Sequence, residues 1–220
     1  MLPGPNQIIA CPHCGALEYY ETLMSGNTFG AKLYSDGKQI APYMPAPPPF
    51  VECHDCHQLF WLKDAMEIGT VSPWNSSAND DPSWVAAPQV QSASEEKLYE
   101  AIERLVADGS SEQLKQVRIL AWRKRNDLYR EDAGTPIELT ALARKNMQDL
   151  SIELSGRGKK GDEVALGDGL MVAELLREQG HFEPALAFLE KNRWAALQNL
   201  ADQLAELCRQ KNSRVVELRV

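Results

Sequence analysis

The chain has 220 residues, of which 44% are apolar and 25% charged, and its formal net charge is −8. This composition is typical of a folded globular protein and excludes wholesale disorder, a collagen-like repeat and a disulfide-dense small scaffold. The longest apolar run is only five residues, 185–189, whereas a membrane-spanning helix needs ~18. The first residues have neither the basic start nor the apolar core of a secretory signal, so we expect a cytoplasmic protein without a membrane segment.

The acidic charge is concentrated in the first part of the chain. Residues 1–93 contain three basic and nine acidic side chains, whereas residues 94–220 contain 20 and 22. Nucleic-acid binding depends on clustered lysines and arginines that contact phosphates. The first part lacks such a cluster, which disfavours a nucleic acid as its partner.

Short strands separated by turns are expected over the first 70 residues. Extended segments are predicted over residues 8–10, 16–22, 28–34, 50–52 and 58–62. Asp36-Gly37, directly after the third of these segments, is a strong hairpin signal. Residues 42–49 contain five prolines, which are incompatible with a central strand and favour an extended polyproline segment.

Residues 71–93 have the composition of a linker arm. They contain three prolines and many Asn, Ser and Asp residues. Trp74 and Trp84 are unusual in a solvated linker, so we expect this arm to lie against one of the domains.

From residue 94 onward the apolar pattern has a helical period. Ser92 and Glu95 have capping-box spacing before the first helix, and a second helix is expected from Ser110. Thr135 to Glu138 combines a cap, a proline and an acidic residue, and it predicts the start of a third helix that ends at Gly156. Further helices are predicted at 167–179, 183–191 and 193–211, with a basic loop at 156–161 and a short strand within 214–220.

These patterns predict the α+β class, in which a small antiparallel sheet precedes an all-α bundle or repeat-like domain. We expect three parts: a β domain at 1–70, the arm at 71–93 and an α-helical domain at 94–220.

Four of the five cysteines form two pairs with the spacing C-x2-C-x38-C-x2-C, namely Cys11, Cys14, Cys53 and Cys56. Each pair can place two thiolates on one tight turn, and two such turns complete a tetrahedral site suited to zinc. Residues 8–63 resemble the zinc ribbon family, which implies a small antiparallel sheet around one structural zinc. The family serves many functions, so the resemblance does not identify a partner. His57 stands where a glycine is usual, and a less regular second turn is expected there.

Two alternatives remain open at this site. His13, His54 or His57 could replace one of the thiolates. Cys11-Pro12-His13-Cys14 also occurs in the active site of thioredoxin-fold thiol oxidases, where a helix N-terminus lowers the thiolate pKa. No helix is expected after Cys14, which disfavours redox chemistry.

Residues 168–191 resemble one tetratricopeptide-type helical hairpin, with small and large apolar residues, a glycine turn, then Ala185 and Phe188. An array needs about three repeats to bury a continuous core, and an ordinary hairpin of a bundle fits these residues equally well. The basic stretch 118–130 is expected to be a solvated helix face, with a site for an acidic partner as the alternative. Cys208 lies on an apolar stripe and is predicted to be a buried thiol.

No catalytic or nucleotide-binding motif is found, and we predict no enzyme. The pattern favours a cytoplasmic zinc-binding protein that interacts with another protein or a peptide, as an adaptor or an inhibitor of the immunity type. A nucleic-acid-associated regulator and an enzyme with an unrecognised site are the alternatives. The oligomeric state is left open. The two halves are expected to have separate cores, so loss of the zinc site should unfold residues 8–63 and leave the helices intact.

Overall fold

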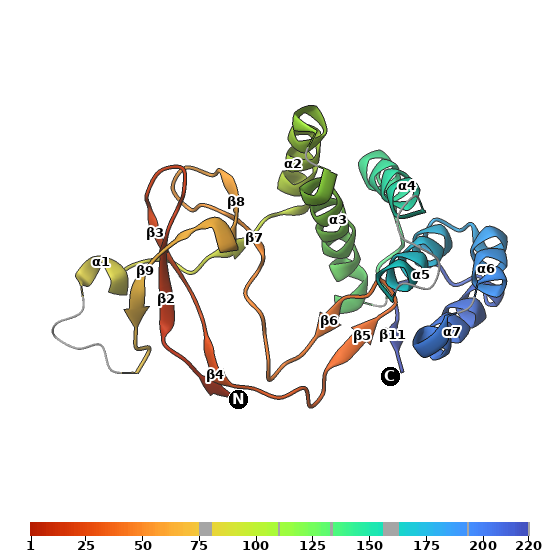
Figure 1. The fold of residues 1–220 in the computed structure, drawn as a ribbon, viewed down its shortest axis with the longest axis horizontal. Coiled ribbons are helices and arrows are strands. Elements are labelled where there is room, and N and C mark those ends of the chain that lie inside the picture. The colour runs from red at the N-terminus through yellow and green to blue at the C-terminus, as the bar shows by residue number, and fades with distance from the viewer. Residues whose placement is uncertain (75–80, 110, 133, 156–162, 193, 220) are drawn as a thin grey trace. The chain divides into compact units, whose positions relative to one another are not determined.

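The structure is a computed structural model that describes residues 1–74, 81–109, 111–132, 134–155, 163–192 and 194–219. The chain forms two compact units. One, called here the β unit, comprises Met1–Ala31 and Ile40–Lys97, and the other, the helical unit, comprises Lys32–Gln39 and Leu98–Val220. Antiparallel sheets followed by helices confirm the predicted α+β class (Figure 1).

The β unit contains a three-stranded antiparallel sheet in the order β3-β2-β9. Its strands are β2 (Asn6–Ala10), β3 (Leu17–Tyr20) and β9 (Met66–Val71). The first two were expected, but β9 lies across the boundary at residue 70 and was not. Gly69 interrupts the apolar pattern of β9. A glycine is needed at this position, since a Cβ there would lie 2.5 Å from the Trp84 ring.

A second sheet of the β unit has the order β10-β7-β8. It consists of β7 (Phe50–Glu52), β8 (Leu59–Trp61) and β10 (Gln91–Ser92). The strands β1 (Leu2–Pro3) and β4 (Leu23–Ser25) form a separate antiparallel pair. Ile9, Val51 and Phe60 are buried together in the core of the unit.

The arm lies against the β unit, as its tryptophans indicated. Trp84, in the short helix α1 (Pro82–Val85), packs on Gly69, and Val90 is buried in the core. The backbone of Tyr19 bonds to Pro88 and to Val90, while β10 pairs with β7. The chain therefore divides differently from the expected three parts, because the arm is integral to the β unit.

The hairpin between the two cysteine pairs belongs to the helical unit. It consists of β5 (Lys32–Tyr34) and β6 (Gln39–Ile40), and its turn at Asp36-Gly37 gives Gly37 a φ of +73°. A strand near the C-terminus, β11 (Glu217–Leu218), pairs antiparallel with β5. The expected tail strand is thus present, and its partner is a segment that the sequence pattern assigned to the β domain at 1–70.

The helical unit is a succession of helices in which each from α3 to α7 packs against the next (Figure 1). The helices are α2 (Glu95–Asp108), α3 (Ser111–Glu131), α4 (Ala141–Ser155), α5 (Glu163–Glu178), α6 (Phe182–Lys191) and α7 (Gln198–Arg209). Trp122 and Trp194 each belong to a buried apolar cluster. Among the described residues no helix is long and apolar enough to cross a membrane.

Two predicted N-caps were wrong, and the helices predicted to begin at 167 and 193 begin at Glu163 and Gln198. The Ser94 hydroxyl, rather than that of Ser92, caps α2 by accepting the N–H of Lys97. Thr140, rather than Thr135, caps α4 by accepting the N–H of Ala143. The Thr135 hydroxyl instead donates to the Asp132 carboxylate at 2.9 Å, because Asp132 organises a turn at that point. The predicted loop at 156–161 lies outside the described residues.

Candidate metal centre

The two cysteine pairs occupy two tight turns with the same backbone hydrogen bonds. In the first turn Gly15 N–H donates to Cys11 C=O at 2.9 Å, and Cys11 N–H donates to Ala16 C=O at 2.8 Å. In the second turn the corresponding bonds run from His57 to Cys53 and from Cys53 to Gln58, each 3.0 Å long. Gly15 and His57 both have a left-handed φ, +79° and +56°. The second turn is therefore as regular as the first, contrary to the expectation based on His57.

The turns bring all four predicted thiols together. The Sγ atoms of Cys11 and Cys56 are 3.8 Å apart, and those of Cys14 and Cys53 are 3.6 Å apart. All four sulfur atoms lie within 4.8 Å of one another. A tetrahedral zinc with bonds of about 2.3 Å holds its sulfurs about 3.8 Å apart. The spacing of the thiols fits such a metal ion.

Backbone amides support the charged form of these sulfurs. Burial raises the pKa of Cys11, and the N–H groups of His13 and Cys14 oppose this rise by bonding to its sulfur. Burial likewise raises the pKa of Cys53, opposed by the corresponding N–H groups of its own turn. The N–H of Ala16 lowers the pKa of Cys14. Since a metal binds the thiolate, these amides act as outer-shell groups that favour metal binding.

Each neighbouring histidine contacts an oxygen atom of the protein. His13 Nε2 is 3.2 Å from the Leu59 carbonyl oxygen. The Nδ1 atoms of His54 and His57 are each 3.3 Å from a carboxylate oxygen, of Glu18 and Glu52 respectively. The four-thiol set therefore forms without any of these histidines.

Glu18 is a buried residue that the sequence reasoning missed. Its carboxylate is 1% exposed, and Oε1 accepts the backbone N–H of His54 at 3.1 Å. Glu18 thus ties β3 to the second cysteine turn, and together with Cys53 and His54 it forms a second group that could hold a metal. The only sequence signal for the burial of Glu18 was strand alternation, which places it on the same sheet face as Tyr20.

The predicted redox alternative lacks its structural basis. Cys14 is followed by Gly15 and then by β3, so the segment after the thiol does not provide the helix N-terminus that would stabilise a reactive thiolate. Cys208, the fifth cysteine, is buried as predicted, and burial raises its pKa to about 11.

The basic stretch 118–130 is not a solvated face, and that prediction was wrong. Arg118 and Arg130 are buried and form ion pairs with Asp149 and Asp36. Arg123 is also largely removed from solvent, and this desolvation lowers its pKa. These arginines bind other parts of the helical unit: Arg118 pairs with a carboxylate of α4, and Arg123 and Arg130 bond to Asp36.

Comparisons with protein-family models, with curated proteins and with solved structures find no match to this chain.

Proposed function

We propose that this chain is a protein-interaction protein whose β unit is a zinc ribbon held by one structural zinc. Cys11, Cys14, Cys53 and Cys56 are the proposed ligands. Four thiolates complete the tetrahedral coordination of zinc. A catalytic zinc requires an open position for a substrate or a water molecule, and this set leaves none. The metal would then stabilise the fold, and function would depend on the surface of the protein.

The observation that carries this proposal is a set of exposed apolar side chains on β4 and on two adjoining loops of the β unit. We call Met24, Phe29, Tyr43 and Met44 the loop cluster. Their exposed fractions are 70%, 77%, 50% and 48%. Large apolar groups gathered on a surface are typical of protein interaction sites, where aromatic and methionine side chains are enriched.

The two loops are held against each other by their backbones. The N–H of Asn27 donates to the Tyr43 carbonyl at 3.3 Å. A Cβ at Gly26 would lie 2.6 Å from the same carbonyl oxygen and 3.1 Å from Met44 Cγ. Only glycine allows this close approach, so the loops are positioned as a pair. A prearranged apolar surface loses less conformational entropy when a partner binds.

Site-specific photocrosslinking tests the proposal. A photoreactive phenylalanine analogue is placed at Phe29 of the zinc-loaded full chain, which is then irradiated in an extract of the source cells. We expect a discrete crosslinked protein at this position. The matched control carries the same group at Ile152, an exposed apolar residue of α4 with 74% exposure.

Two outcomes would contradict the proposal. One is equal labelling at Phe29 and Ile152, which would indicate nonspecific contact with apolar surface. The other is a crosslink to nucleic acid at Phe29, which would favour the nucleic-acid alternative.

A further inference from the structure

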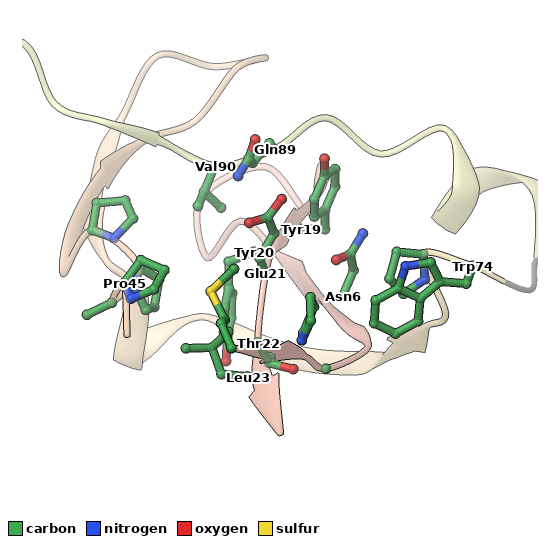
Figure 2. A pocket seen from close by; sticks show the side chains of 17 residues that line it. Asn6, Tyr19, Tyr20, Glu21, Thr22, Leu23, Pro45, Trp74, Gln89 and Val90 are labelled. Atoms are coloured by element: carbon green, nitrogen blue, oxygen red, sulfur yellow. The ribbon is translucent and has the colours of Figure 1, made fainter. Parts of the chain in front are cut away.

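A pocket of the β unit lies beside the loop cluster. It has a volume of about 550 Å³, within the ~300–1,000 Å³ range of pockets that hold small ligands. Leu23 and Pro45 line it, and each is the chain neighbour of a loop-cluster residue. Figure 2 shows Pro45 and Trp74 at opposite ends of the pocket, with Tyr20, Glu21 and Leu23 between them. The pocket is thus continuous along the chain with the proposed interaction surface.

The side chains of this pocket suit a planar cation. Among the described residues that line it, only Glu21 has a charged side chain. Trp74 and Tyr19 supply aromatic faces, and Trp74 is 60% exposed and therefore accessible. A guanidinium group stacks on such rings and bonds bidentately to a carboxylate.

Amide oxygens provide further acceptors. Asn6 and Gln89 also line the pocket, from β2 and from the arm respectively. A guanidinium has five N–H donors, more than one carboxylate can accept. Additional oxygens around the pocket can accept the remaining donors.

The charge of the β unit favours a basic partner. The unit contains ten acidic side chains and two lysines, whereas the helical unit contains 21 basic and 21 acidic side chains. The whole net charge of −8 therefore resides on the unit that carries the pocket. Such a field attracts basic segments and accelerates their association.

We infer that this pocket binds an arginine side chain from a basic segment of the protein partner. This inference rests on the proposed interaction function and adds the chemistry of the partner. In the complex, Glu21 pairs with the guanidinium, Trp74 and Tyr19 contact its faces, and apolar residues of the partner reach the loop cluster.

A peptide titration followed by NMR tests the inference. The probe is a short glycine- and alanine-containing peptide with one central arginine, added to the ¹⁵N-labelled, zinc-loaded full chain. We expect the indole N–H signal of Trp74, assigned with Trp74→Phe, to shift saturably. The indole signals of Trp122 and Trp194, which are buried in the helical unit, serve as internal references. The same peptide with citrulline has nearly the same shape without the charge and should bind about tenfold more weakly.

Variants separate the pocket from the general acidity of the unit. Glu21→Gln should weaken arginine-peptide binding by about tenfold. Asp64→Asn removes the same charge from an exposed position outside the pocket and should change binding less than about twofold. Equal losses in the two variants, equal binding of the citrulline peptide, or no shift of the Trp74 signal would each overturn the inference.

The photocrosslinking result distinguishes failure of this inference from failure of the proposed function. A partner that still crosslinks at Phe29 in the Glu21→Gln chain, together with an inert arginine peptide, would overturn the pocket assignment alone. Absence of any partner at Phe29 would contradict the interaction function itself.

Discussion

The side-chain amide nitrogen of Asn126 lies 3.1 Å from a carboxylate oxygen of Asp36, although 90 positions separate the two residues. The same nitrogen donates to the Glu178 carboxylate at 3.0 Å. Arg130 also donates to the Asp36 carboxylate, and Arg123 donates to its backbone carbonyl. Asp36 is fully buried. A hairpin inserted between two cysteine pairs is thus fixed to α3 by a buried polar network.

Asp36→Ala should strongly destabilise the helical unit. It leaves the Arg130 guanidinium, whose side chain is 3% exposed, with the Asp127 carboxylate and the Arg123 carbonyl oxygen as its acceptors. Removing one partner of a buried ion pair costs about 3–5 kcal/mol of folding stability. Because Arg130 keeps its pair with Asp127, we expect a loss near the lower value. Urea unfolding followed by tryptophan fluorescence measures the change. Glu217→Gln, which breaks the half-exposed pair with Lys32, is the control. Similar unfolding curves for the two variants would contradict this view of the network.

Glu178 should make folding stability depend on pH. Burial raises its pKa well above the ordinary value, and Glu174 and Asp36 raise it further against the opposing effects of Arg177 and Trp122. Above a pH of about 4.3 the unfolded chain releases a proton that the folded protein retains, so the free energy of unfolding falls as pH rises. This stabilising contribution is complete at lower pH and is lost as pH increases towards the folded-state pKa.

Glu178→Gln removes this titration while keeping an oxygen that can accept the Trp122 N–H bond. We expect the variant to gain stability relative to the parent chain as pH increases from about 4.5 to 8. Urea midpoints across this range provide the measurement. If the urea midpoints of the variant and the parent chain changed with pH in parallel, Glu178 would have the same protonation in the folded and unfolded states.

Local patterns explain what the sequence predicted correctly about the fold. Alternation and turn residues located β2, β3 and the Asp36-Gly37 turn, and helical periodicity located α2 and α3. The start of α4 was misplaced because Thr135 follows Asp132, whose turn uses the Thr135 hydroxyl. A capping pattern read along the chain cannot reveal that its key side chain is already bonded elsewhere.

The candidate site shows the same division between local and long-range information. Cysteine spacing identified the four thiols, because each pair is local and only the meeting of the pairs had to be inferred. The role of Glu18 depends on a contact 36 positions away, and that of Asp36 on contacts about 90 positions away. Glu18 belongs to no local motif, and the turn signal at Asp36-Gly37 locates the turn without revealing the contacts of the Asp36 carboxylate. In both residues the charge gave no indication of burial.

Metal removal should affect the hairpin differently from the strands on either side of it. In Cys53→Ser, or after strong chelation, β2, β3, β7 and β8 should exchange their amide protons faster, because they surround the thiols. From the sequence, residues 8–63 were expected to unfold together. Residues 32–39 belong to the helical unit, so we now expect them to remain folded. The amide of Tyr34 and those of the helices should retain their protection. Hydrogen–deuterium exchange with mass spectrometry measures this, and simultaneous loss of protection at β5 would contradict it.

Metal content should be one zinc per chain. A mercurial that attacks thiolates should release the zinc in proportion to the modification of four cysteines. Cys208 should react slowly in the folded protein, because it is buried and its pKa is raised to about 11. Elemental analysis combined with a chromogenic zinc indicator measures both quantities. Substoichiometric zinc together with four freely reactive thiols would contradict the assignment.

Zinc affinity should change in opposite directions when the left-handed residue of each cysteine turn is replaced. His57 has a φ of +56°, a conformation that costs a residue with a Cβ about 1–2 kcal/mol. The His57 side chain is 70% exposed and its contact with Glu52 is weak, so His57→Gly should relieve backbone strain and lose little else. Gly15→Ala introduces this strain in the first turn, where a Cβ would meet nothing within 4 Å. Because metal binding is coupled to the formation of the turns, zinc affinity should rise in His57→Gly and fall by about tenfold in Gly15→Ala. Competition with a calibrated chelator measures both affinities, and a change in the same direction for both variants would show that backbone strain does not set the affinity.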